Sequence, residues 1–175
     1  MKKIFITGSA GFIGYHLSKL LLEKGFYVHG YDALTTFYDV KLKLDRNLIL
    51  KSFSNYSFTS GKLENANILN SIMTEFKPDA VIHLAAQAGV RHSIEYPMDY
   101  IQSNIIGTFN VIEASRKNNI QHLLIASTSS VYGDSITMPY QENHKSDNQL
   151  SIYAATKKST ESISHAYSHI WELPI

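Results

Sequence analysis

The chain has 175 residues, a formal net charge of +1 and no cysteine. This length suits one domain with a sizeable core, and the near-neutral charge gives no reason to expect nucleic acid or an anionic membrane as a partner. The absence of cysteine excludes disulfides and thiolate metal sites, which fits a reducing compartment and predicts a cytoplasmic protein. The apolar run at the start ends at Thr7, too short for a secretory signal, and no stretch approaches the length of a membrane-spanning helix.

Short β-rich runs alternate along the chain with stretches of helical periodicity. In chain order, the predicted elements are residues 3–7 (strand), 12–24 (helix), 26–31 (strand), 39–50 (helix), 56–60 (strand), 66–76 (helix), 80–84 (strand), 98–118 (helix), 122–127 (strand) and 151–171 (helix). Residues 173–175 resemble the approach to a sixth strand. This alternation predicts an α/β fold, a doubly wound parallel sheet in three layers with helices on both faces. Ligands bind such sheets beyond the carboxyl ends of the strands.

A glycine-rich loop follows the first predicted strand, with Gly8, Gly11 and Gly14 at regular spacing. The first glycine permits a tight turn, the second lets backbone approach a pyrophosphate, and the third lets helix and strand pack closely. The helix that starts here offers free N–H groups and the positive end of its dipole to phosphates. The loop therefore predicts a Rossmann-type dinucleotide site, with a purely structural glycine turn as the alternative.

Asp32 ends the second predicted strand. A carboxylate at this point can accept hydrogen bonds from ribose hydroxyls and would repel a 2′-phosphate. The residue therefore favours NAD over NADP. An aspartate that merely opens a turn is the alternative.

Tyr153 and Lys157 are spaced i, i+4, so on a helix they share one face. An ammonium beside a phenol favours the phenolate and lowers the tyrosine pKa, which suits acid/base work near neutral pH. The spacing alone is weak, because Tyr15 and Lys19 match it too. A run of hydroxyls, residues 127–130, follows the fifth predicted strand and could bond both a substrate hydroxyl and the Tyr153 phenol.

With these features the chain resembles the extended short-chain dehydrogenase/reductases of the nucleotide-sugar epimerase and dehydratase type. The matching positions are residues 7–14, Asp32, residues 83–86, Asn104, residues 127–133, Tyr153 and Lys157. Within that family, residues 37–43, 85–91 with Ser93, 151–158 and 167–169 look most like UDP-glucuronate 4-epimerases. The resemblance implies NAD as a retained cofactor and epimerisation at C4 through a 4-keto sugar, from UDP-glucuronate to UDP-galacturonate.

The resemblance also implies a role for each site residue. Tyr153 would remove the proton of the sugar 4-hydroxyl, Lys157 would hold the nicotinamide ribose, and Thr128 would take the family's Ser/Thr position. The substrate would meet Thr128, Ser129 and Arg91. The cofactor would meet Gly8, Ala10, Gly11, Phe12, Ile13, Gly14, Asp32, Leu63, Leu84, Ala85, Ala86, Asn104, Ser127, Tyr153 and Lys157.

Other functions stay open. Related 4,6-dehydratases read Thr-Asp-Glu where this chain has Thr128-Ser129-Ser130, so dehydration loses its expected acid and base and ranks below epimerisation. A reductase and a non-catalytic NAD-binding module are further alternatives. Lys62 stands where the family usually has an aspartate that contacts the adenine. His165 and His169 are spaced i, i+4 but have no evident third ligand, so no metal site is predicted.

Family members are about twice as long as this chain, and their second half adds strands and most of the substrate pocket. The resemblance therefore implies that residues 1–175 are an incomplete NAD-binding domain, truncated before the substrate-binding part and inactive as a fragment. It also implies a homodimer through the helices near residues 98–118 and 151–171. The polar segment 141–149 is predicted to be a mobile flap.

Overall fold

Five parallel strands form the sheet at the centre of the computed structural model, which describes residues 2–175. The strands are β1 (Lys3–Thr7), β2 (Tyr27–Asp32), β3 (Tyr56–Ser60), β4 (Ala80–His83) and β5 (His122–Ile125). Their spatial order is β3-β2-β1-β4-β5, and β1 pairs with both β2 and β4, so Ile6 lies between Gly30 and Ile82. The predicted α/β class and doubly wound parallel sheet are confirmed.

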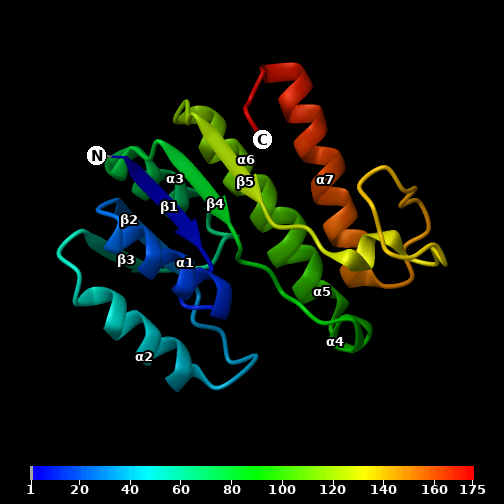
Figure 1. The fold of residues 1–175 in the computed structure, drawn as a ribbon, viewed down its shortest axis with the longest axis horizontal. Helices are drawn as coiled ribbons and strands as arrows, with labels where there is room; N and C mark the ends of the chain where they lie inside the picture. Colours follow the sequence, from blue (N-terminus) through cyan, green and yellow to red (C-terminus); the bar gives the residue numbers. More distant parts are fainter. Residues whose placement is uncertain (1) are drawn as a thin grey trace.

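Within residues 2–175, the strands are accompanied by seven α-helices, one π-helical stretch and one 3-10 turn. The helices are α1 (Phe12–Glu23), α2 (Val40–Lys51), α3 (Ala66–Phe76), α4 (Val90–Glu95), α5 (Pro97–Tyr100), α6 (Gly107–Lys117) and α7 (Ile152–Trp171). Figure 1 shows α1 and α2 on one face of the sheet and α3, α6 and α7 on the other, which gives the expected three layers.

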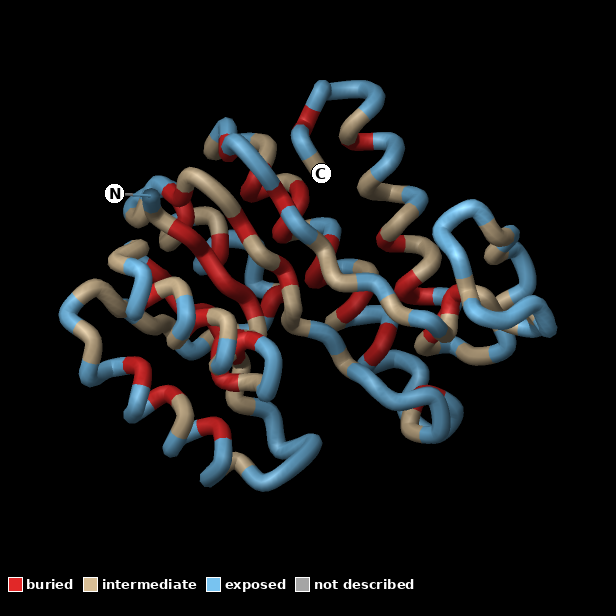
Figure 2. The backbone as a smooth tube through the Cα atoms, viewed as in Figure 1, coloured by how far each residue is buried: buried red, intermediate tan, exposed pale blue. Residues whose placement is uncertain are grey.

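The two faces of the sheet carry separate cores because successive strand residues point to opposite sides. Ile4, Ile6 and Val28 pack under α1 and α2 with Leu22 and Leu50. The opposite face of the strands packs under α3, α6 and α7, in a cluster formed by Phe5, Tyr31, Val81, Leu123, Leu69, Met73, Val111, Ile112 and their neighbours. Figure 2 shows this burial concentrated in the inner strands and in the inward faces of the helices.

The predicted long helix over residues 98–118 is interrupted. It runs as α5, a π-helical stretch from Ile101 to Ile106, and then α6. Two elements were not predicted, namely α4 and a 3-10 turn from Ser129 to Tyr132. The predicted strands over residues 80–84 and 122–127 were too long at their carboxyl ends, because the chain leaves the sheet after His83 and Ile125.

Residues 173–175 lie beside β5, where the Leu123 N–H donates to the Pro174 carbonyl at 2.8 Å. No strand forms at this point of the described chain, although Leu173 is buried in the core beneath α7. None of the helices within residues 2–175 combines the length and the apolar character needed to cross a membrane.

Candidate functional site

The glycine loop makes a cradle that only glycine permits. A Cβ on Gly14 would lie 2.1 Å from the Gly8 carbonyl oxygen, and a Cβ on Gly8 would lie 2.8 Å from the Ala85 nitrogen. Gly8 also has a φ of +73°, which other residues rarely adopt. The first turn of α1 has no side-chain cap, so its N–H groups are open to an anion.

Asp32 is the last residue of β2, and its side chain holds the glycine loop in place by a hydrogen bond. Its carboxylate accepts hydrogen bonds from the Ala10 N–H at 3.0 Å and from the Leu34 N–H at 2.8 Å. The side chain is nearly buried, at 9% exposure. Each carboxylate oxygen has a second lone pair, so the group can still accept a bond from a ligand hydroxyl.

Lys43 on α2 lines the same cleft as Asp32, and no role was predicted for it from the sequence. Its ammonium donates to the Thr35 carbonyl at 2.8 Å and the Thr35 hydroxyl at 3.1 Å, and it lies 4.3 Å from the centre of the Tyr38 ring. Burial lowers the pKa of Lys43, and the charge of Asp32 opposes that shift. Only the fold brings the two residues together, so the sequence carried no signal for this pair.

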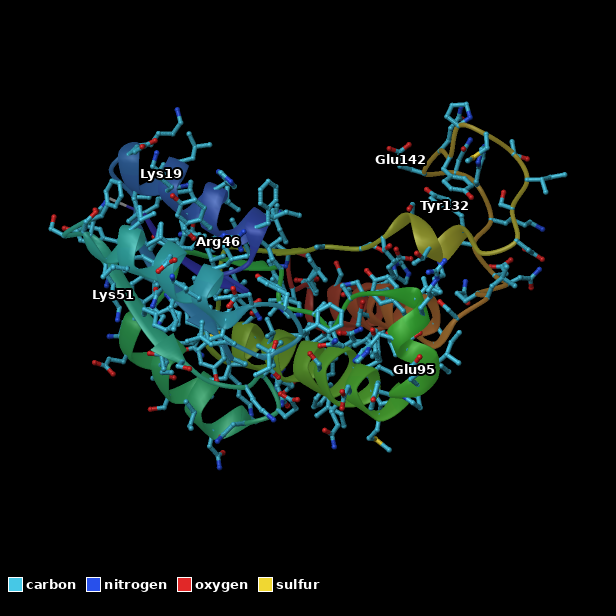
Figure 3. The ribbon with its side chains drawn as sticks, turned by 90° about the horizontal axis from the view of Figure 1, so that it is seen from below. Lys19, Arg46, Lys51, Glu95, Tyr132 and Glu142 are labelled. Carbon is cyan, nitrogen blue, oxygen red and sulfur yellow. The ribbon has the colours of Figure 1, made fainter. Side chains whose placement is uncertain are left out.

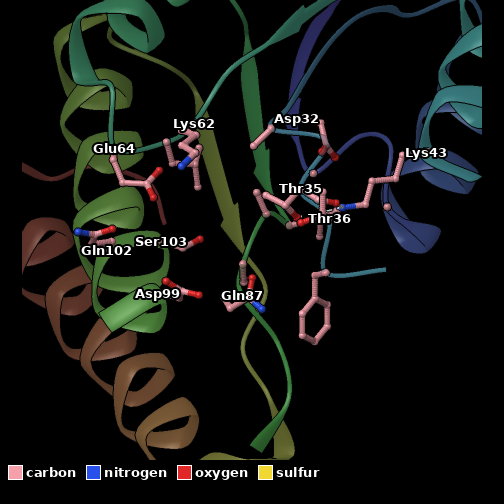
Figure 4. A pocket seen from close by; sticks show the side chains of 18 of the residues that line it. Asp32, Thr35, Thr36, Lys43, Lys62, Glu64, Gln87, Asp99, Gln102 and Ser103 are labelled. Carbon is pink, nitrogen blue, oxygen red and sulfur yellow. Dashed lines mark hydrogen bonds between the residues drawn. The ribbon is translucent and has the colours of Figure 1, made fainter. Parts of the chain in front are cut away.

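A cleft of about 580 Å³ opens between these walls, across the carboxyl ends of the strands. Figure 4 shows Thr35, Thr36 and Lys43 on one side and Asp99, Gln102 and Ser103 on the other. Of the predicted cofactor residues, the cleft is lined by Gly8, Gly11, Asp32, Leu63, Leu84, Ala85 and Ala86. Lys62 and Glu64 also line it, so the departure at residue 62 faces the predicted adenine side.

A buried histidine joins β1, β4 and α6 beneath the cleft. His83 Nδ1 lies 2.7 Å from the Thr7 hydroxyl oxygen, and its Nε2 lies 2.9 Å from the Thr108 hydroxyl oxygen. Thr7 accepts a hydrogen bond from the Ala85 N–H as well, at 3.2 Å. Burial lowers the pKa of His83 to about 3, and the charge of Lys157 acts in the same direction. The ring is therefore neutral at physiological pH and fixes the loop after β4.

Asn104 lies in the π-helical stretch and is buried. Its carboxamide accepts a bond from the Gln87 N–H at 2.8 Å and donates to the Gln87 carbonyl at 3.0 Å and the Thr156 hydroxyl at 3.1 Å. The side chain thus ties the loop after β4 to α7. Its predicted contact with the cofactor stays a prediction.

The predicted acid/base pair lies on the first turns of α7, which Ser151 caps by accepting from the Ala154 N–H at 3.1 Å. The Tyr153 ring packs against Tyr100, with ring centres 6.0 Å apart. Lys157 is buried at 4% exposure. Burial lowers the pKa of Lys157, and the charge of Glu161 opposes that shift.

Thr128 opens the 3-10 turn that packs against α7, and its hydroxyl accepts from the Ser130 N–H at 3.3 Å. The predicted residues Thr128, Ser129, Tyr153, Lys157 and the exposed Arg91 do not line the 580 Å³ cleft. Ser127, predicted to meet the cofactor, donates to Glu161 and lines a second cleft of about 480 Å³ between β5 and α7. The predicted site residues therefore fall into two groups, those that line the 580 Å³ cleft and those of a predicted catalytic edge formed by Thr128, Tyr153 and Lys157 at the start of α7.

The segment after the 3-10 turn projects beyond the start of α7. Figure 3 shows Tyr132 at the end of the turn and Glu142 on this segment, at the opposite end of the molecule from Lys19 and Arg46. No cluster of three potential metal ligands occurs within residues 2–175.

Comparison with known proteins adds a family model described as GDP-mannose 4,6 dehydratase, which matches residues 5–175. The chain is 51% identical to Protein CapI of Staphylococcus aureus, over 98% of this chain and 51% of that protein. It is 44% identical to a UDP-glucuronate 4-epimerase of Thermodesulfobacterium geofontis, over 97% of this chain and 52% of that protein. The chain thus spans about half the length of these curated relatives.

Among solved structures, the fold is similar to the UDP-glucuronic acid 4-epimerase of Bacillus cereus in complex with UDP-glucuronic acid and NAD. The TM-score is 0.91 at 33% identity, over 99% of this chain and 54% of that one. A UDP-glucose 4-epimerase from Brucella ovis in complex with NAD gives a TM-score of 0.85 at 28% identity, over 99% and 50% of the two chains.

Proposed function

The chain belongs to the nucleotide-sugar epimerase and dehydratase family whose model is described as GDP-mannose 4,6 dehydratase, and from this we propose that it provides the NAD-binding and acid/base half of a nucleotide-sugar 4-epimerase. The sugar nucleotide is UDP-glucuronate and the product UDP-galacturonate. The observation that carries the proposal is the buried Lys157 with Tyr153 on α7, packed against the turn that Thr128 opens. This turn follows β5 as the glycine cradle follows β1, so both lie beyond the carboxyl ends of the parallel strands.

The residues present fit NAD. The open N–H groups at the start of α1 suit its pyrophosphate, and Asp32 retains lone pairs for the ribose hydroxyls. Leu63, Leu84 and Ala85 give the cleft apolar walls. When bound, NAD supplies the hydride acceptor and donor for the sugar C4.

The side chains of this chain transfer the proton of the sugar 4-hydroxyl and orient the sugar and the cofactor. Tyr153 takes the proton of the sugar 4-hydroxyl and later returns it, while Lys157 holds the nicotinamide ribose. Thr128 bonds the same sugar hydroxyl, which aligns it with the phenol. Ser129 follows Thr128 directly, and Arg91 lies on α4, which packs against α7, so both can join the substrate side.

The hydroxyl run also separates epimerisation from dehydration. Elimination of water from the sugar needs an additional acid and base, and positions 129 and 130 carry serines. The Ser130 hydroxyl accepts a bond from Thr128 at 3.4 Å. Two neutral hydroxyls support the epimerase over the dehydratase.

The test is an NMR assay of UDP-glucuronate conversion, with NAD retention measured in parallel on the 175-residue chain. We expect NAD binding by this chain, and slow or absent turnover unless the second half found in its relatives is supplied. Tyr153→Phe should abolish turnover and leave NAD binding intact, with Tyr15→Phe as the matched control. A 4-keto-6-deoxy product would identify a dehydratase, and NAD binding without conversion in any longer form would leave only a binding module.

We further propose that the protein is a cytoplasmic homodimer. The absence of cysteine supports the compartment. Exposed apolar side chains on the helices near residues 98–118 and 151–171 support the dimer, and they are Met98, Ile101, Ile106, Phe109, Ile152, Ile170 and Trp171.

A further inference from the structure

Glu161 extends the acid/base pair of α7 by one more turn. Tyr153, Lys157 and Glu161 are spaced i, i+4 and i+8, so they form a row along one face of the helix. The first two members of this row are the predicted acid/base pair, and the third has no predicted role.

The Glu161 carboxylate joins three separate segments. Its Oε1 accepts a hydrogen bond from the Ser127 hydroxyl at 2.5 Å, at the point where the chain leaves β5. Its Oε2 accepts from the Lys158 ammonium at 3.1 Å, and that ammonium also donates to the Ser146 hydroxyl at 2.6 Å. Glu161 therefore ties the end of β5 to α7 directly, and it reaches the projecting loop 133–150 only through the Lys158 ammonium.

Each of the joined segments borders the catalytic edge. Ser127 is the immediate neighbour of Thr128, so a shift of Ser127 moves the predicted partner of Tyr153. Ser146 lies in the loop that returns the chain to α7, and Gln149 adds bonds to the Ser146 carbonyl at 2.6 Å and the Val131 carbonyl at 3.1 Å. A change at Glu161 should reach both sides of the site.

Glu161 also compensates for the burial of Lys157. Lys157 as a residue is 4% exposed, and Glu161, one helical turn away, is the group whose charge favours its protonated form. The charge of Lys157 acts on the His83 ring of β4, which is neutral, and Tyr153 of the same pair packs on Tyr100 of α5. His122 on β5 and His165 on α7 line the same cleft as Glu161.

The chain contains a matched row that lacks these connections. Tyr15, Lys19 and Glu23 have the same spacing on α1. There the carboxylate bonds its own lysine directly, at 3.1 Å, with the two side chains 42% and 49% exposed. In α7 the carboxylate bonds Ser127 and Lys158, and Lys157 is left buried.

We propose that Glu161 is a positioning residue of the epimerase site, which holds Ser127, and with it Thr128, against α7 and orients Lys158 toward the loop 133–150. The inference rests on the proposed function, because it concerns the groups that bind the sugar hydroxyl. It assigns Glu161 no contact with substrate or cofactor.

The test compares Glu161→Gln with the control Glu23→Gln by hydrogen exchange and by the pH dependence of turnover. Removing the charge of Glu161 should make Lys157 lose its proton at lower pH, so the alkaline limb of the kcat profile should move down by roughly 0.5–1 pH unit. Amides in residues 127–133 and 141–149 should exchange several-fold faster. Glu23→Gln should change neither quantity.

Two further variants separate charge from contact. Glu161→Asp keeps the charge but is too short for both bonds, so it should raise exchange and leave the alkaline limb in place. Ser127→Ala should raise exchange near residue 127 alone. Glu161→Gln with wild-type exchange and an unmoved limb would overturn the proposal. If no form of the protein turns over substrate, the proposed function fails. Hydrogen exchange then still tests the inference, because faster exchange in Glu161→Gln supports the role of Glu161 in holding these segments and unchanged exchange contradicts it.

Discussion

At the scale of single residues, the buried His83 makes stability depend on pH. The pKa of His83 in the folded chain is about 3, well below the ordinary histidine value near 6.5. Between these values the unfolded chain binds a proton that the folded chain does not, so stability is complete above about pH 6.5 and is lost as the pH falls. Burial lowers the pKa of His29 to about 4, which adds in the same direction.

We therefore expect the free energy of unfolding to fall by about 2–3 kcal/mol through His83 between pH 7 and pH 4.5. His83→Asn removes that titration, so its unfolding free energy should differ less between the two pH values than that of the wild type. Urea denaturation at both pH values measures the difference. His165→Asn, at an exposed position, is the control, and an equal pH difference in His83→Asn and wild type would contradict the prediction.

Lys62 offers a second test at this scale. Its side chain lines the cleft on the predicted adenine side, where the family pattern has a carboxylate. Lys62→Asp should restore an acceptor for the adenine amino group and tighten NAD binding by about 1 kcal/mol, roughly fivefold. Titration calorimetry measures the affinity, and Lys51→Asp, on the outer part of α2, controls for the charge change. Weaker binding in Lys62→Asp would mean that the lysine itself contacts the cofactor.

A site residue could be predicted from the sequence when its pattern lies within one element or at the end of one strand. The glycine loop, Asp32 and the Tyr153–Lys157 pair are spacings within one element or at one strand end, and a sequence displays such spacings directly. The common cleft wall of Lys43 and Asp32 and the Glu161–Ser127 hydrogen bond are arrangements between elements. Neither has a sequence signature, because a lysine or glutamate on a helix is usually solvated.

At the scale of elements, two glycines between β1 and α1 should affect different properties when substituted, Gly14 the stability of the fold and Gly11 the binding of NAD. Gly14→Ala would place a Cβ 2.1 Å from the backbone oxygen of Gly8, whereas Gly11→Ala would place one 3.1 Å from the same atom. Gly14→Ala should therefore lower the unfolding free energy by about 1–3 kcal/mol, and Gly11→Ala by less than about 1 kcal/mol.

Gly11→Ala should nevertheless weaken NAD binding about tenfold, because its methyl group occupies the approach to the pyrophosphate. Thermal unfolding and NAD titration of both variants measure the two effects. Equal stability losses in the two variants would contradict the packing argument. An unchanged NAD affinity in Gly11→Ala would contradict the placement of the pyrophosphate.

Element order was predictable because the sheet needs alternating buried runs, and all ten predicted elements have counterparts. The short elements were not predictable. The helix α4 has six residues, too few for a helical period to stand out. The 3-10 turn from Ser129 to Tyr132 depends on the Thr128 hydroxyl accepting from the Ser130 N–H, a contact that the residue types alone do not specify.

At the scale of the whole molecule, the exposed side of α6 and α7 predicts association. Phe109 on α6 is 43% exposed beside Tyr167 of α7, with ring centres 6.3 Å apart. If this face joins two copies, Phe109→Glu should give a monomer by light scattering at concentrations where the wild type is a dimer. Leu48→Glu, on α2 in the opposite layer, replaces a 70% exposed side chain and should leave the mass unchanged. A monomeric wild type would contradict the proposed homodimer.

The π-helical stretch from Ile101 to Ile106 separates α5 from α6, so the two helices need not continue each other's rotation about the helix axis. The half before it is fixed by Tyr100, whose hydroxyl bonds the carbonyls of Ala88 and Gly89. The half after it is fixed by Val111 and Ile112 in the core. One residue turns an α-helix by about 100°. Deleting one residue here would make the helix regular and rotate one half relative to the other, so that either the Tyr100 hydrogen bonds or the core packing of Val111 and Ile112 would be lost. The wide turn thus lets Tyr100 and the core residues of α6 keep their separate positions along one continuous helix.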